Sequence, residues 1–154
     1  MPAPNDTPLI REGEEIRSRL RYSVEQIIEF ARLTGDANPL HHDLRAAQRA
    51  RFGEIIASGQ QTASHMMGLV ASHFSRQDDG VPREMLCLNF NFAFKAPIFA
   101  EQEITLVWRV SQVEPSARQG GYVGQLEGSA RVAGRACVVG RGTVLVKRAA
   151  ARVS

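Results

Sequence analysis

Residues 58–74, SGQQTASHMMGLVASHF, carry the longest helical pattern of the chain. The pattern begins after Ser58-Gly59, and its apolar positions recur at steps of four, three and four residues. Further apolar side chains lie beside this stripe, so the helix is apolar over much of its circumference and should be enclosed by a sheet. The stripe consists of Ala63, Met67, Val70 and Phe74, with Met66, Leu69 and His73 beside it.

Four strand patterns follow this helix. In the first, large apolar residues at every second position alternate with small or polar ones, which is the period of a strand. Turn-forming residues at Pro115, Gly120-Gly121 and Gly134 separate the remaining three apolar runs. The predicted strands cover residues 86–94, 104–113, 122–132 and 136–146.

The N-terminal half predicts one strand and two short helices. Apolar and basic residues alternate over residues 15–22, which predicts a half-buried strand. A capping-box pattern at Ser23 predicts a helix to residue 33, and Asp43 can cap a second helix that ends near residue 50. Together these elements predict an α+β domain in which an antiparallel sheet covers the long helix.

The length of 154 residues, with 44% hydrophobic and 23% charged residues, is typical of one globular domain. We assign this domain to residues 11–148, with a flexible N-terminal tail at residues 1–10 and a C-terminal tail at residues 149–154. The net charge of +3, from 19 basic and 16 acidic side chains, is too small to indicate a nucleic-acid partner. No aromatic-rich basic strand accompanies the arginines.

Cys87 and Cys137 are the only cysteines, and both lie in apolar runs. We therefore expect small buried side chains rather than a metal site or a disulfide scaffold. No apolar run approaches the length of about eighteen residues that crosses a bilayer, and no secretory leader pattern opens the chain. The sequence thus predicts a soluble, cytoplasmic protein without a membrane partner.

Residues 35–41, GDANPLH, place a carboxylate and an imidazole five positions apart around Pro39. Gly35 ends the preceding helix, and Pro39 keeps that helix from continuing. Two interpretations are open at this point. Asp36 can cap local backbone while His41 starts the next helix, or the two side chains can hold a water molecule between two proton-handling groups.

Residues 35–43, GDANPLHHD, resemble the hydratase motif of the MaoC-like, (R)-specific enoyl-CoA hydratase family. Residues 52–59, FGEIIASG, resemble the stretch that leads into that family's central helix, and residues 88–99 resemble its F-K-x-P strand. The similarity extends over about residues 14–147 in the family's order. It implies the hot-dog fold, a curled antiparallel sheet around a central helix. It also implies reversible syn hydration of trans-2-enoyl-CoA to (R)-3-hydroxyacyl-CoA.

The resemblance further implies the roles of three residues. Asp36 and His41 become the catalytic pair that activates water, and the order of their proton transfers stays open. The amide of Gly59 becomes the donor to the thioester oxygen, a role that suits a helix N-terminus with its free amides and positive dipole end. Coenzyme A is part of the substrate, so no separate cofactor is implied.

Three more residues are placed at the substrate. Ser58 and Met67 stand where the family carries a histidine and a serine that supports the catalytic aspartate; Ser64, one turn earlier, can substitute for that serine. Asn38 is expected to shape the loop through a bond from its side chain to the backbone, with substrate contact as the alternative.

The remaining histidines do not predict a metal site. His42 is adjacent to Asp43, but adjacent side chains diverge and no cluster of further ligands follows. His65 and His73 lie on the long helix, where packing or surface positions are expected.

Two other functions compete with hydration. The first is a hot-dog acyl-CoA thioesterase, against which the intact Asp-to-His motif argues. The second is a non-catalytic subunit that binds acyl thioesters, which the departures at Ser58 and Met67 favour.

A single curled sheet leaves an edge strand unpaired, and unpaired edges are usually covered. The resemblance implies that two subunits join their sheets edge to edge, giving a homodimer or a dimer of dimers with the pocket at the subunit boundary. The acyl-CoA substrate would then contact both chains, with Lys95 or arginines near that boundary as phosphate contacts.

Overall fold

A computed structural model of the chain describes residues 7–150. These residues form one antiparallel sheet, three α-helices and one 3-10 helix, which confirms the predicted α+β class. The 3-10 helix shows no periodic pattern in the sequence because three residues are too few to repeat. In chain order the elements are β1 (Glu15–Leu20), α1 (Val24–Thr34), the 3-10 helix η1 (Pro39–His41), α2 (Leu44–Arg49), α3 (Gly59–His73), β2 (Arg83–Phe94), β3 (Ile104–Pro115), β4 (Tyr122–Val132) and β5 (Arg135–Arg148).

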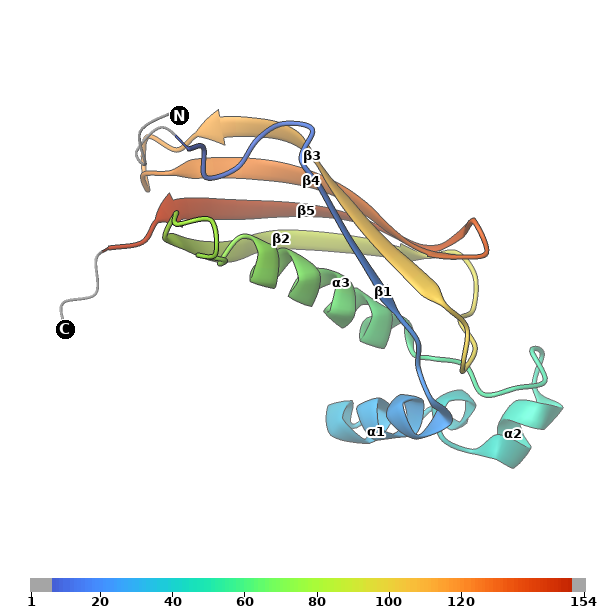
Figure 1. Cartoon of the computed structure of the whole chain (residues 1–154). Coiled ribbons are helices and arrows are strands. Elements are labelled where there is room, and N and C mark those ends of the chain that lie inside the picture. The colour runs from blue at the N-terminus through green and yellow to red at the C-terminus, as the bar shows by residue number, and fades with distance from the viewer. Residues whose placement is uncertain (1–6, 151–154) are drawn as a thin grey trace.

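The strands of the sheet lie in the order β1-β3-β4-β5-β2, so β1 and β2 form its edges. The β4–β5 hairpin turns through Ala133 and Gly134, which both have positive φ (48° and 80°), as tight hairpins favour. Helix α3 lies along one face of the sheet (Figure 1). Helices α1 and α2 lie near the N-terminal end of α3, on its side away from the sheet (Figure 1).

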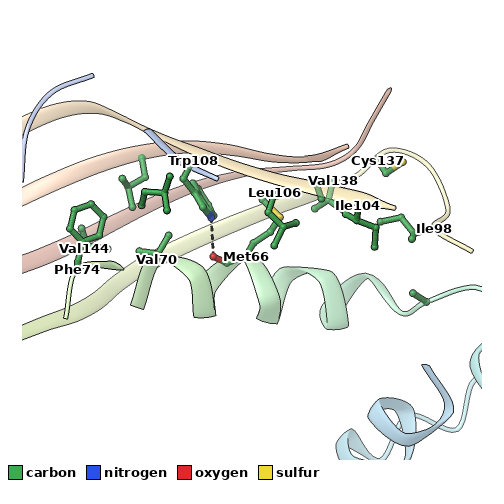
Figure 2. Packing of buried hydrophobic residues seen from close by; sticks show 14 of the residues in the cluster. Met66, Val70, Phe74, Ile98, Ile104, Leu106, Trp108, Cys137, Val138 and Val144 are labelled. Carbon is green, nitrogen blue, oxygen red and sulfur yellow. Dashed lines mark hydrogen bonds between the residues drawn. The ribbon is translucent and has the colours of Figure 1, made fainter. Parts of the chain in front are cut away.

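The core lies between α3 and the sheet. Met66, Val70 and Phe74 of α3 are buried there, together with Trp108 of β3. The indole Nε1 of Trp108 donates a hydrogen bond of 2.9 Å to the carbonyl of Met66, which ties the sheet to the helix backbone (Figure 2). The ring lies over Gly128 of β4, where any Cβ would overlap it, so this cross-strand position requires glycine.

The buried stripe of α3 differs from the predicted one. It passes through Ala63, Met66, Val70 and Phe74, whereas Met67 is only half-buried. Steps of three, four and four residues are as helical as the predicted steps, so periodicity alone cannot choose between the two methionines. The sheet face that carries Trp108 lies against Met66.

The prediction of a flexible N-terminal tail at residues 1–10 is wrong for its last two residues. Leu9 and Ile10 are buried in the core, because apolar side chains gain from burial wherever they stand in the chain. The guanidinium of Arg83 donates to the carbonyl of Leu9 at 2.9 Å, which fixes this segment beside β2. Residues 1–6 lie outside the described part.

At the other end, the amide of Ala149 donates to the carbonyl of Pro82 at 2.9 Å. The last four residues of the predicted C-terminal tail, 151–154, lie outside the described residues. Cys137 is buried as predicted, but Cys87 is exposed, because it lies beside a register shift in the edge strand β2. Within residues 7–150, no helix is both long and apolar enough to cross a membrane.

Candidate active site

The loop between α1 and α2 brings Asp36 and His41 to the same cavity. Gly35 ends α1 in the left-handed conformation (φ 70°), and Pro39 is the first residue of η1. The side chain of Asn38 caps η1 by accepting from the amide of Leu40 at 3.1 Å, which confirms its expected loop-shaping bond. This compact turn places Nε2 of His41 at 3.8 Å from Oδ2 of Asp36.

The ring of His41 is oriented by the backbone. Its Nδ1 lies 2.7 Å from the carbonyl oxygen of Ile56. A carbonyl only accepts hydrogen bonds, so Nδ1 carries the proton in the neutral ring and Nε2 presents its lone pair. The ring is buried, with Nε2 directed at Asp36. His41 is therefore arranged to accept a proton on the side of the cavity.

The carboxylate of Asp36 accepts one hydrogen bond at each oxygen. Oδ1 accepts from the amide of Asn38 at 2.9 Å, and Oδ2 accepts from Nε2 of Gln60 at 3.1 Å. The 3.8 Å between Oδ2 and the ring of His41 exceeds a direct hydrogen bond. It is short enough for one water molecule to contact both atoms, which is the arrangement that water activation requires.

Gly59 stands at the first position of α3, where the backbone amide has no intrahelical acceptor. The hydroxyl of Ser58 caps the helix by accepting from the amide of Gln61 at 3.3 Å. A Cβ at Gly59 would lie 2.6 Å from the ring of Phe94, so a side chain here would collide with that ring. Gly59 lines the cavity, so the N-terminus of α3, with the positive end of its dipole, borders it.

The cavity has a volume of about 550 Å³. Its wall is mostly apolar and is formed by α3, the segment before α3 and the end of β2. Lys95 is the lysine of the wall, and the hydroxyl of buried Thr62 contributes beside it. The polar and charged side chains that line the cavity are Asp36, His41, Ser58, Gln60, Thr62 and Lys95.

Four of the six predicted site residues border this cavity: Asp36, His41, Ser58 and Gly59. Asn38 and Met67 do not line it. The hydroxyl of Ser64 donates to the carbonyl of Gln60 at 2.7 Å, so it is bound to its own helix rather than to Asp36.

Gln60, Thr62 and Phe94 also line the cavity, although the sequence did not predict them as site residues. The position of Gln60 directly after the glycine at the helix start was the available signal. Thr62 shares a hydrogen bond of 3.0 Å with the hydroxyl of Tyr22, and burial raises the pKa of Tyr22 to about 12. Tyr22 is therefore a neutral structural partner of the cavity wall.

His42 and Asp43 have local structural roles. Nε2 of His42 lies 3.1 Å from the carbonyl of Ala37, and Asp43 caps α2. The bond from the amide of Ala46 keeps the pKa of Asp43 below its ordinary value. Within residues 7–150, no three His, Cys, Asp or Glu side chains gather closely enough to hold a metal ion.

Comparison with known proteins gives one family match and several relatives. The family model of the MaoC like domain matches residues 5–128. The (R)-specific enoyl-CoA hydratase of Aeromonas caviae is 29% identical over 93 residues, which are 60% of this chain and 65% of that protein. The mitochondrial 3-hydroxyacyl-(acyl-carrier-protein) dehydratase FERN of Solanum lycopersicum is 26% identical over 96 residues, 62% of this chain and 53% of that one. The chain thus spans between about half and two thirds of the length of the curated relatives it matches.

Solved structures match over most of the chain. The (R)-hydratase from Aeromonas caviae involved in PHA biosynthesis has a TM-score of 0.75 at 25% identity, covering 88% of this chain and 96% of the other. A MaoC-like dehydratase from Rhodospirillum rubrum has a TM-score of 0.75 at 21% identity, covering 92% and 95%.

Proposed function

The chain belongs to the MaoC-like hydratase and dehydratase family of the hot-dog fold, and on that premise we propose that it catalyses reversible syn hydration of trans-2-enoyl-CoA thioesters to (R)-3-hydroxyacyl-CoA. One observation carries the proposal: Oδ2 of Asp36 and Nε2 of His41 lie 3.8 Å apart at one wall of an apolar cavity. A carboxylate and a neutral imidazole at this separation can activate one water molecule.

The proposed reaction balances with one water molecule. Its oxygen forms a bond to the β-carbon while the π bond between the α- and β-carbons breaks, and the electron pair of that bond moves toward the thioester oxygen as an enolate. One O–H bond of the water breaks, and its proton passes to the Asp36–His41 pair. The α-carbon receives one proton from the same pair, which returns the pair to its starting state. Both groups lie together at one wall of the cavity, so we expect the hydroxyl and the proton to add to the same face of the substrate.

Charge that develops on the thioester oxygen needs a donor in place before the reaction. We assign this role to the amide of Gly59, which has no intrahelical acceptor and lies at the positive end of α3. The ring of Phe94 packs against Gly59 at this side of the cavity.

The apolar wall suits an acyl chain. Lys95 lines the cavity, and the guanidinium of Arg51 lies 5.5 Å above the ring of Phe52, another wall residue. We propose these two cations as contacts for the phosphates of coenzyme A, which enters as part of the substrate, so that no separate cofactor is needed.

We further propose a homodimer, or a dimer of dimers, joined along β2. This twelve-residue strand is an edge of the sheet, and Leu86 and Leu88 on it are exposed. Exposed apolar edges are normally covered. Phe94 ends the same strand at the cavity, so pairing along β2 would bring the partner subunit close to the substrate. We expect the enzyme to act in the cytoplasm as one domain, with no nucleic acid or membrane as partner.

The test is an assay of the purified protein with crotonyl-CoA and longer trans-2-enoyl-CoAs. Loss of the conjugated absorbance without release of thiol is the expected result. Release of free thiol would identify a thioesterase. Binding without either change would identify a non-catalytic subunit. Chiral analysis of the product should return the (R)-3-hydroxyacyl-CoA.

A further inference from the structure

We propose that Gln60 is the positioning residue of Asp36, holding its carboxylate so that Oδ2 faces His41. This inference rests on the proposed hydration. Gln60 is the second residue of α3, and its side chain reaches the loop that follows α1. Its Nε2 lies 3.1 Å from Oδ2 of Asp36, the oxygen that also faces His41.

Hydrogen bonding determines which way the amide of Gln60 points. The hydroxyl of Thr34 donates to the carbonyl of Phe30 at 3.0 Å, so its oxygen is left to accept from Nε2 of Gln60 at 3.4 Å. The NH₂ group therefore meets two acceptors, Thr34 and Asp36. The reverse orientation would place the amide oxygen against a carboxylate, where neither atom has a proton to donate.

The amide fixes the carboxylate without competing for its proton. Oδ1 of Asp36 is held by the amide of Asn38, and Oδ2 by Gln60, so rotation of the carboxylate would break both bonds. One lone pair of Oδ2 remains for water. A side-chain amide does not titrate in the working range, so its hydrogen bond to Asp36 does not change through a protonation of Gln60.

Neither of the other two candidates on α3 takes this role. Ser64 donates to the carbonyl of Gln60, and Met67 has no hydrogen-bond donor and does not line the cavity. Of these residues of α3, only Gln60, the second residue of the helix, hydrogen-bonds to Asp36.

The first test replaces the amide by a side chain of the same length. Gln60→Met keeps the packing volume and loses the donor, so kcat should fall about ten-fold, as for a hydrogen bond to a charged group, while KM and the melting temperature stay close to those of the parent. Ser64→Ala is the matched control on the same helix and should keep the parental kcat. In an Asp36→Asn background, Gln60→Met should have no further effect on the residual rate.

The second test uses pH. In the Gln60→Glu variant, the introduced side chain would face Asp36, His41 and Lys95, the titratable groups that line the cavity. At neutral pH its negative charge repels Asp36, whereas its protonated form can donate a hydrogen bond. The kcat of this variant divided by that of the parent should rise several-fold between pH 8 and pH 5. A role in packing alone gives a ratio that does not change with pH.

The outcomes separate this inference from the proposed function. Parental kcat in Gln60→Met, or a pH-independent ratio for Gln60→Glu, overturns the role of Gln60 when the parent hydrates enoyl-CoA and Asp36→Asn does not. Absence of hydration by the parent, or full activity in Asp36→Asn, overturns both.

Discussion

Single side chains at the cavity are aimed by backbone atoms. The carbonyl of Ile56 orients the ring of His41, and the amide of Asn38 holds one oxygen of Asp36. Both partners are backbone groups, so replacing the side chain at position 36 or 41 does not remove them. The chemistry of the pair can therefore be removed without removing the fold.

Asp36→Asn and His41→Ala should each lower kcat/KM for enoyl-CoA hydration by about 10²–10⁴-fold, the usual contribution of general acid–base groups. Steady-state assays with crotonyl-CoA measure the loss, and circular dichroism checks that the fold is retained. Near-parental turnover in either variant would show that the pair does not carry the reaction.

Gly59→Ala tests the close approach of Phe94 to the start of α3. The added Cβ would lie 2.6 Å from that ring, so the ring, which is 57% exposed, must move away and lose its packing against the start of α3. The melting temperature and kcat should both fall. In a Phe94→Ala background the same change should no longer lower the melting temperature, and a persistent loss there would locate the strain elsewhere.

At the scale of elements, the N-terminus of α3 is where the fold and the site meet. Ser58 caps the helix directly before Gly59, so the position of the Gly59 amide depends on that cap. Helix α1 offers a comparison, because Ser23 caps it through the predicted capping box but does not line the cavity.

Ser58→Ala and Ser23→Ala should each destabilise the protein by about 1 kcal/mol, the usual effect of losing an N-cap hydroxyl. Only Ser58→Ala should also lower kcat, because it loosens Gly59, the residue whose amide we propose as the donor to the thioester oxygen. Thermal unfolding and steady-state kinetics at one protein concentration measure both effects. An equal loss of kcat in the two variants would mean that the cap of α3 has no special link to catalysis.

The connection from α3 to β2 depends on an ion pair. The buried guanidinium of Arg83 binds both oxygens of Asp79 at 2.8 Å, and these bonds hold the pKa of that carboxyl far below its ordinary value of 3.8. A carboxyl with a depressed pKa in the folded state stabilises the protein fully above its unfolded value. That contribution is lost as the pH falls below about 4.

Asp79→Asn should therefore unfold at a lower urea concentration than the parent at pH 7, and this difference should shrink as the pH falls below about 4. Asp78→Asn is the control, because the side chain of Asp78 is 82% exposed, and it should match the parent at every pH. Urea titrations at pH 7, 4 and 3 make the comparison. A difference for Asp79→Asn that stays constant over this range would contradict the role of the pair.

At the scale of the whole molecule, β2 is an edge strand of the sheet formed by residues 7–150. We expect a second subunit to pair along this edge. The opposite edge, β1, is half as long, with six residues against twelve. The longer edge offers more backbone groups and carries Leu86 and Leu88.

Light scattering should return at least twice the chain mass of 16.9 kDa. Leu88→Lys should shift the protein toward the monomer and reduce activity, because a charge on an edge strand opposes pairing. Leu33→Lys is the matched control: Leu33 is 70% exposed on α1, away from this edge. A parent of about 17 kDa that remains active at that dilution would contradict the dimer.

The sequence by itself determined the α-helices and the strands, though not the three-residue η1, because helix caps, turn glycines and side-chain periods act over a few residues. The capping box at Ser23, the end of α1 at Gly35 and the start of α3 at Ser58-Gly59 all follow from local hydrogen bonds. The fold class and the positions of Asp36 and His41 in one loop were accessible for the same reason.

Tertiary structure alone decided which neighbours these elements meet. Met66 rather than Met67 faces the core because Trp108, far away in the chain, lies against it. Ile10 lies near the N-terminus of the chain but is buried, because its side chain packs against Gly124 of β4. Gln60 reaches Asp36 only because α3 packs beside the loop after α1. Contacts between distant segments depend on the packing of whole elements, and the side-chain periodicity of a single segment does not predict them.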